Sequence, residues 1–231
     1  MKCFRIMAIA PGLLVPVLLH AQTPFQNLDF EQANISPAPV GYIPTYALNP
    51  ISAADAMPYW TVREDTTVCT AVSSSPGLDQ TFVYLAPVYN YGYASHPSLQ
   101  GAFSIELSAS RLDTYKSASI SQTGLVPAGT KSIQFQLRTY LGGPGVESLI
   151  VTLNGTPVNF STFGGVMNMA GDVSAFAGTT AELTFTATSF SNYMIDSIVF
   201  SSQAVPEPST LTLLTVGGLF LGWRWRKSSR A

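Results

Sequence analysis

Phe103-Ser104-Ile105-Glu106-Leu107 alternates apolar and polar residues without a break, and Ile133-Gln134-Phe135-Gln136-Leu137-Arg138 does the same. Alternation with a period of two predicts β-strands that place one face on a core and the other in water. Leu183-Thr184-Phe185-Thr186 repeats the pattern. The central part of the chain is therefore predicted to be built from strands.

Turn signals separate these strands. Leu149 to Leu153 runs into Asn154-Gly155, the dipeptide that best tolerates positive φ in a two-residue hairpin turn, so we expect a hairpin that returns through Val158-Asn159-Phe160. Further signals are Pro127-Ala128-Gly129, Gly142-Gly143-Pro144-Gly145 and Gly164-Gly165. Outside the two termini no apolar stripe has the helical period of 3.6 residues. The expected fold class is all-β, an antiparallel β-sandwich.

The N-terminus has the features of a secretory signal. Lys2 and Arg5 precede an apolar stretch from Ile6 to Leu19, and Leu19-His20-Ala21 offers a site for signal peptidase. We therefore expect a signal helix at 1–21 that is removed on export. The alternative is an uncleaved N-terminal anchor, against which Pro11 and Pro16 argue because they interrupt a long membrane helix.

The C-terminus combines a short motif, an apolar stretch and a basic cluster. Val205, Pro206, Glu207 and Pro208 form the motif. The apolar stretch contains Leu211, Leu213, Leu214, Val216, Leu219, Phe220 and Leu221, and the basic end contains Arg224, Arg226 and Lys227. A helix over 209–225 would span roughly 26 Å, slightly less than the roughly 30 Å core of a bilayer. We predict a transmembrane helix whose basic end stays in the cytoplasm.

This tail resembles the PEP-CTERM sorting signal, which consists of a Val-Pro-Glu-Pro box, a short hydrophobic helix and an Arg-rich end. The resemblance implies an exported protein of a bacterium with two membranes, and an exosortase-like membrane protease that cuts near the box. The alternative is a permanent C-terminal anchor. The expected organisation is a signal peptide at 1–21, an extracytoplasmic body at 22–202 and a sorting tail at 203–231. The precursor would lie in the inner membrane facing the periplasm, and the product at the cell surface or in the extracellular matrix.

The charge of the body argues against nucleic acid as a partner. Six of the 11 basic residues but one of the 13 acidic residues lie in the two end segments. The body that remains is acidic and its few cations are scattered, whereas phosphate backbones require clustered positive charge.

Cys69 is the one cysteine left once Cys3 departs with the signal. No internal disulfide is then possible. A lone thiol in an exported protein can pair between molecules or act as a nucleophile. In the run from Thr67 to Ala71, however, Cys69 is typical of a small buried apolar residue.

Three segments of the body resemble the galactose-binding-like jelly-roll of carbohydrate-binding modules: Asn27-Leu28-Asp29-Phe30-Glu31, Pro58-Tyr59-Trp60 and the run from Met194 to Ser201. The resemblance implies a structural calcium ion near the first and last strands, with Glu31 and Asp196 as candidate ligands. Alternation places Asp196 on one face with Ile198 and Phe200, so it would point inward. Such a carboxylate needs Ca²⁺, backbone N–H groups or an Arg as its partner. No other cofactor is expected.

Trp60, Tyr89, Tyr91 and Tyr93 form a candidate ligand platform, because flat aromatic faces stack on sugar rings, and exopolysaccharide is the candidate partner. Asn90, His96 and Gln100 are candidate partners for sugar hydroxyl groups. The alternative is structural, since Tyr and Trp also anchor sandwich cores and loops.

Catalytic motifs are missing from the sequence. His96 is the single histidine of the body, and no zinc, nucleotide or nucleophile-elbow motif occurs. Glycosidase chemistry needs two carboxylates, but Asp113, Glu147, Asp172 and Glu182 stand in no recognisable arrangement. We expect a non-catalytic surface or matrix protein. The alternatives are a carbohydrate-binding module and a surface glycan hydrolase.

Overall fold

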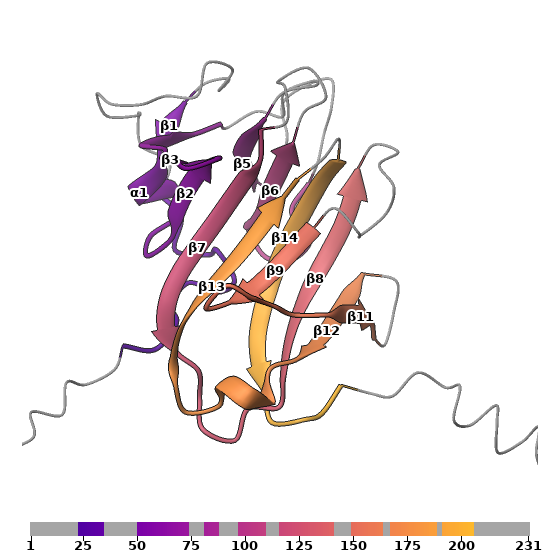
Figure 1. Ribbon diagram of the computed structural model, residues 1–231. Helices are drawn as coiled ribbons and strands as arrows, with labels where there is room; N and C mark the ends of the chain where they lie inside the picture. Colours follow the sequence, from indigo (N-terminus) through magenta and orange to yellow (C-terminus); the bar gives the residue numbers. More distant parts are fainter. Residues whose placement is uncertain are drawn as a thin grey trace, which may run out of the picture.

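The structure of the chain, a computed structural model, describes residues 23–34, 50–73, 81–87, 97–109, 116–140, 149–163, 167–188 and 191–205. Two six-stranded antiparallel sheets pack face to face over these residues (Figure 1). The predicted all-β antiparallel sandwich is confirmed. The predicted signal helix and C-terminal helix lie outside the described residues, within which no helix is long and apolar enough to cross a bilayer.

Each sheet interleaves strands from distant parts of the chain. The first sheet has the order β10 (Thr156–Pro157), β9 (Leu149–Leu153), β13 (Thr180–Ala187), β7 (Ala118–Leu125), β2 (Thr61–Glu64) and β3 (Thr67–Val68). The second sheet has the order β11 (Phe160–Thr162), β12 (Asn168–Asp172), β8 (Ser132–Tyr140), β14 (Ser191–Ser201), β6 (Phe103–Ala109) and β5 (Phe82–Pro87). The remaining elements are β1 (Ile51–Ser52), α1 (Ala53–Ala56), β4 (Ala71–Val72) and the 3₁₀ turn η2 (Ser174–Phe176).

The core lies between the two sheets and follows the predicted alternation. On the first sheet Val151, Phe185 and Ile120 pair across three strands, and all are at most 1 % exposed. Across the sandwich the ring of Phe135 meets that of Phe185 edge to face, with centroids 5.3 Å apart. The inward residues of both sheets therefore form one continuous apolar core.

The predicted turn at Asn154-Gly155 is confirmed, with φ of 48° and 74° at the two residues. The return strand was predicted wrongly. Pairing with β9 covers Thr156 and Pro157, not Val158 to Phe160. Pro157 has no N–H to donate, and after one more bond, from Val158 N–H to the Val151 carbonyl (2.8 Å), the chain crosses to the second sheet as β11.

A bulge in β14 changes which side chains face the core. The register with β8 shifts between Asp196 and Val199, and Ser197 takes a positive φ of 50°. Ile198 and Phe200 therefore face the core, while Asp196 pairs with Gln136 on the opposite face of the sheet. The prediction that Asp196 shares a face with Ile198 and Phe200 is wrong, because alternation assumes an unbroken strand.

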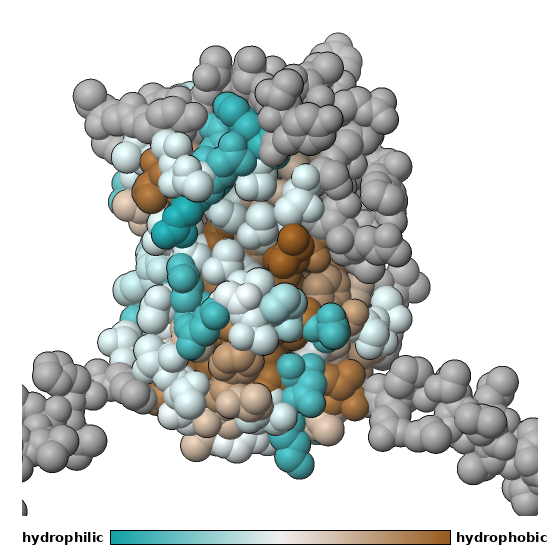
Figure 2. All heavy atoms as spheres, in the orientation of Figure 1, coloured by the Kyte–Doolittle hydropathy of each residue, from teal (hydrophilic) through white to brown (hydrophobic). Residues whose placement is uncertain are grey.

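Several hydroxyl side chains lie on the outer face of the first sheet, which is toward the viewer in Figure 1, and two of them, Ser119 and Ser121, are buried there. One row across four strands consists of Thr152, Thr184, Ser121 and Thr61, and the row beside it of Ile150, Thr186, Ser119 and Arg63. Figure 2 shows this side as a mostly pale surface, of intermediate hydropathy, with scattered teal and brown patches. The face is neither strongly charged nor broadly apolar.

Both ends of the described body lie at the same end of the sandwich. The Thr23 carbonyl accepts from Leu125 N–H (2.8 Å), at the end of β7. The Gln203 carbonyl accepts from the hydroxyl of Ser132 (2.8 Å), at the start of β8. One turn joins Leu125 to Ser132. The N-terminal end of the body therefore lies beside the end of β7 and the C-terminal end beside the start of β8, on the two sides of that turn (Figure 1).

Candidate functional site

A buried polar face lies on the second sheet, on the side away from the core. This polar face consists of Ser104, Glu106 and Ser108 on β6, Asn192 and Asp196 on β14, and Gln136 and Arg138 on β8. Glu106 is 0 % exposed and Asp196 is 1 % exposed. The expectation that the polar residues of β6 lie in water is therefore wrong, and Gln136 and Arg138 are half-buried.

Large side chains flank the polar face and account for part of its burial. Tyr84 on β5 and Met194 on β14 stand on either side of Glu106 in the strand register, and both are fully buried. With Phe82 and Ala86 they form a second apolar cluster, against which Leu99 packs. Period-two alternation identifies the polar side of a strand but carries no information about what else covers that side.

Asp196, a member of the polar face, is surrounded by hydrogen-bond donors. Its Oδ2 accepts from the Ser104 hydroxyl (2.6 Å) and from Gln100 N–H (3.1 Å), and its Oδ1 accepts from Ser197 N–H (2.6 Å). Burial raises the pKa of this carboxyl above its ordinary value of 3.8, and the negative charge of Glu31 raises it further, while the three hydrogen bonds act in the opposite direction. The net effect is a pKa above 3.8.

Glu31 fastens the N-terminal segment to the start of β6. Its Oε1 accepts from the N–H groups of Ala102 (2.8 Å) and Phe103 (3.1 Å), and its Oε2 also accepts from Ala102 (3.0 Å). Gly101 takes a φ of 60°, and a Cβ atom there would collide with the Glu31 carboxylate. Glu31 and Asp196 thus hold one segment, residues 100–104, from two sides.

Glu31 and Asp196 accept hydrogen bonds from protein groups, whereas the jelly-roll resemblance implied that they bind calcium. Ca²⁺ takes roughly 6 to 8 oxygen ligands at one point. Here the oxygens of Glu31 and Asp196 are directed at N–H and O–H groups instead. Across the described residues no three His, Cys, Asp or Glu side chains gather as a metal site. Of the three partners proposed for Asp196, backbone N–H groups are the ones found.

A cleft of about 580 Å³ opens beside this junction. Its lining consists of Phe25, Asn27, Leu28, Asp29, Gln32, Gln100, Ser197, Ile198 and Val199. Gln100 is an exposed member of this lining, and its Oε1 accepts from the Ser197 hydroxyl (2.9 Å) and from Gln136 Nε2 (3.1 Å). The cleft is therefore rich in amide groups and holds one acidic group, Asp29.

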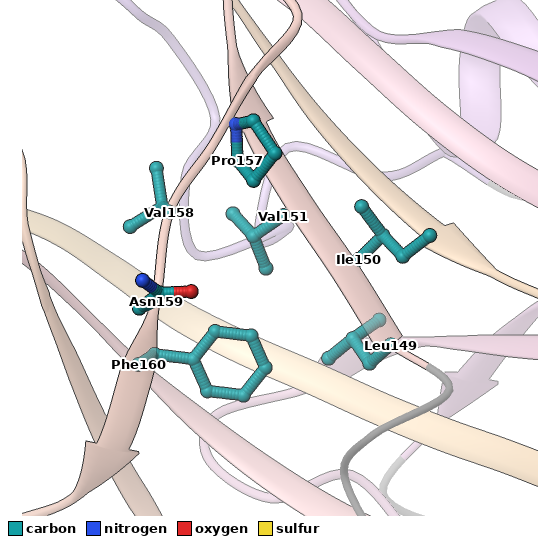
Figure 3. A pocket seen from close by; sticks show the side chains of 7 residues that line it. All are labelled: Leu149, Ile150, Val151, Pro157, Val158, Asn159 and Phe160. Carbon is teal, nitrogen blue, oxygen red and sulfur yellow. The ribbon is translucent and has the colours of Figure 1, made fainter.

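A second hollow lies where the chain crosses between the sheets. It has a volume of about 310 Å³, and Figure 3 shows Pro157, Ile150, Leu149 and Phe160 around it, with the Asn159 amide at one side. Ile150 is 42 % exposed. This apolar groove, as we call it, continues the hydroxyl-rich outer face of the first sheet at the β9 edge.

Two residues singled out in the sequence are part of the core. Trp60 is 6 % exposed, packs against Phe30 and donates from Nε1 to the Asn27 carbonyl (3.0 Å), so its ring is not available to a surface ligand. Cys69 is a free, buried thiol, as predicted. Burial raises its pKa to about 11, which keeps it protonated and unreactive.

Several predicted site residues lie outside the described residues: Tyr89, Tyr91, Tyr93, His96, the box residues Pro206 to Pro208, the apolar stretch and the basic end. The structure brings Glu31, Asp196 and Gln100 together. Sequence reasoning missed Glu106, Arg138 and Asn192 as members of a buried face. Their spacing on predicted strands was visible, but the strand order that aligns them was not.

Residues 204–227 match the PEP-CTERM protein-sorting motif. The predicted resemblance of the tail is confirmed, and the chain carries the sorting signal of exported proteins. The match covers the tail alone, so it does not place the body in a family. A search of curated proteins found no significant match.

Solved structures similar to the chain include two cyclases. One is an apo cyclase from Fischerella sp., with 12% identity and a TM-score of 0.42 over 77% of this chain and 94% of that chain. The other is a cyclase from Fischerella sp. TAU, with 12% identity and a TM-score of 0.40 over the same shares. TmCBM61 in complex with β-1,4-galactotriose has 15% identity and a TM-score of 0.34 over 77% of this chain and 97% of that chain. These similarities are too distant to assign an activity or a ligand.

The raised pKa of Asp196 predicts a pH-dependent stability. The folded state binds more protons than the unfolded state just above pH 3.8, so the contribution of Asp196 to stability falls as the pH rises through that range. The free energy of unfolding of Asp196→Asn should therefore gain on the wild type as the pH rises from about 4, as measured by urea titrations at successive pH values.

Asp172→Asn is the matched control for this titration, because a hydrogen bond from Ser174 N–H lowers the pKa of Asp172. That contribution is present above pH 3.8 and is lost as the pH falls through the lowered pKa. Asp196→Asn should therefore diverge from the wild type as the pH rises above 3.8, whereas Asp172→Asn should run parallel to it there and approach it as the pH falls below 3.8. Parallel curves for wild type and Asp196→Asn would contradict the assignment.

Removing the Glu31 carboxylate should destabilise the attachment of residues 100–104, and the loss of stability should be the same with and without calcium. Glu31→Ala leaves the N–H groups of Ala102 and Phe103 without their acceptor, a loss of about 1–2 kcal/mol or roughly 3–6 °C in Tm. Glu182→Ala, at an exposed glutamate of β13, should change Tm little. Thermal melts in calcium and in chelator should coincide. A calcium-dependent rise in Tm that disappears in Glu31→Ala would contradict this prediction and support a metal site at Glu31.

Proposed function

We propose that this chain is an exported, non-catalytic component of the cell surface or extracellular matrix, delivered by its sorting tail. A signal peptidase removes residues 1–21, and an exosortase-type membrane protease then cuts near the Pro-Glu-Pro box. Before that cut the tail holds the precursor in the inner membrane, with the body in the periplasm. The observation that carries the proposal is the sorting motif at 204–227, directly after the last strand of the sandwich.

The use of the carboxylates supports a non-catalytic role. Glu31 and Asp196 bind backbone N–H groups, Asp65 accepts from Ser117 N–H (2.7 Å), and Glu64 pairs with Lys116 (2.7 Å). Asp172 accepts from the backbone at the start of η2. These acids hold loops and strand ends in place, whereas a glycosidase needs two carboxylates that face a common substrate.

The state of Cys69 suits an oxidising compartment. The thiol is 5 % exposed, and its raised pKa suppresses the thiolate that starts disulfide exchange. A body of this size forms a core without disulfides. Export therefore exposes no reactive thiol from the described residues.

Binding of exopolysaccharide is the second candidate function, favoured by the apolar groove and the hydroxyl rows beside it. Sugars present apolar C–H faces and polar rims, and the groove offers Ile150, Phe160 and Pro157 next to the Asn159 amide (Figure 3). One hydroxyl row begins at the same edge of the sheet, at Thr152. A neutral glycan lying across the strands would meet both kinds of group.

Substitutions in the tail test the main proposal. Pro206→Ala combined with Pro208→Ala should block processing, so that uncut precursor accumulates in the membrane fraction and mature protein is lost from the cell surface. Immunoblots of cell fractions with an antibody to the body provide the measurement. The control is Pro127→Ala in an exposed turn of the body. Equal processing of both variants, or full-length wild type in the cytosol, would contradict the proposal.

A matched pair of substitutions tests polysaccharide binding. Ile150→Ser places a hydroxyl at the groove and should weaken sedimentation with exopolysaccharide from the producing cells about tenfold, or about 1.4 kcal/mol. Val68→Ser, at a 52 % exposed valine on the opposite edge of the same sheet, should bind like the wild type. No binding by the wild type, or equal binding by both variants, would exclude a glycan site at the groove.

A further inference from the structure

The end of the sandwich from which the tail leaves is a platform of segments joined by backbone hydrogen bonds. Three segments form it: the turn Val126–Lys131 between β7 and β8, the segment 172–179 around η2, and the strand end 201–205. We call it the β7–β8 end. Val126 and Gly178 join the first two segments by a bond of 2.9 Å from Gly178 N–H to the Val126 carbonyl. Lys131 N–H donates to the Ser201 carbonyl (2.8 Å), which ties in the third.

The sorting tail begins immediately after this platform. The Ser132 hydroxyl holds the Gln203 carbonyl at 2.8 Å, and the sorting motif starts at residue 204. The predicted membrane helix starts near Ser209, six residues beyond Gln203. Six extended residues reach about 20 Å at most. The body therefore cannot move farther than that from the bilayer while the tail is intact.

The N-terminus imposes the same orientation at an earlier stage. The Thr23 carbonyl is held by Leu125 N–H, at the other side of the same turn. The predicted apolar stretch of the signal ends at Leu19, four residues before Thr23, which is at most about 14 Å. A precursor that retains both end segments would have two short tethers on one end of the sandwich.

The chemistry of the β7–β8 end suits a phospholipid surface. Its exposed residues are small and mostly uncharged: Pro127, Ala128, Gly129, Ser174, Ala175, Gly178, Thr179, Ser202, Gln203 and Ala204. Lys131 and Asp172 are its two charged residues and balance each other. The rest of the body is acidic and would be repelled by anionic headgroups, whereas this end would not.

We propose that, while the precursor is attached through its tail, the β7–β8 end lies against the phospholipid surface of the membrane. This inference rests on the proposed function of the tail. It places the Pro-Glu-Pro box in the narrow space between body and bilayer, where a protease embedded in the membrane reaches it and a soluble one is hindered. The opposite end of the sandwich, where β13 ends at Ala187, lies about 26 Å farther from the membrane. This distance is the length of the eight residues of the strand.

Site-specific quenching tests this orientation in the exported precursor with its tail uncut. A fluorophore is attached at Ala128→Cys, in the turn of the β7–β8 end, or at Thr188→Cys, beyond the far end of β13. The wild type, whose Cys69 is buried, gives the labelling background. The proteins are reconstituted in vesicles of phosphatidylethanolamine and phosphatidylglycerol that carry nitroxide-labelled headgroups. Quenching should be at least threefold stronger at position 128. Equal quenching, or stronger quenching at position 188, would overturn the proposal.

A spacer variant tests whether the short tether causes the difference in quenching between positions 128 and 188. A 24-residue Gly-Ser insert between Gln203 and Ala204 adds about 27 Å of root-mean-square length and should bring the two signals together. A difference that persists with the insert would overturn the tether argument. Extraction with alkaline carbonate distinguishes a failure of the sorting-tail proposal from a failure of the orientation proposal. A tail that washes out of the vesicles contradicts the sorting-tail proposal itself, whereas an integrated tail with the wrong quenching pattern contradicts the orientation alone.

Discussion

The body depends on strand β14, the last strand of the described residues, which lies inside its sheet between β8 and β6. Backbone pairing joins it to β8 from Asn192 to Ser201 and to β6 from Ser191 to Ile195. Without β14 the second sheet would fall into two pieces, β5–β6 and β8–β12–β11. The second-to-last strand, β13, is placed in the same way between β9 and β7. Both sheets are therefore completed by the final residues of the body.

This order of assembly connects the fold to the proposed export. β14 pairs with strands as distant in sequence as β6, so its contacts are long-range. Folds with long-range contacts form slowly, because the chain loses the entropy of loop closure before these contacts stabilise it. The core cannot close until the residues just before the sorting motif are available. On the proposed function, the tail holds the chain at the membrane while this closure takes place, and the finished body has its tail end against the bilayer.

The sequence predicted the strands and the fold class because period-two alternation is a local property, as at Phe103–Leu107 and Ile133–Arg138. It did not predict that the polar side of β6 is buried, since that depends on Tyr84 and Met194 from other strands. One inserted residue at Ser197 was enough to reverse the predicted face of Asp196. The proximity of Glu31 and Asp196 followed from the jelly-roll resemblance, but N–H and O–H groups take the place of the calcium ion that the resemblance implied. Whether a carboxylate meets a cation or an N–H group is decided by backbone directions that spacing does not encode. The Asn154-Gly155 turn was predicted because its chemistry is local, and the strand after it was missed because Pro157 ends the ladder.

A comparison of two truncated chains tests the central claim that β14 completes the fold immediately before the sorting tail. One chain spans residues 22–205, and the other stops after Thr188 and so lacks β14. Urea unfolding followed by circular dichroism should give a single cooperative transition for the chain that ends at Val205 and no cooperative transition for the shorter chain. A cooperative transition of equal midpoint in the chain that ends at Thr188 would contradict the account.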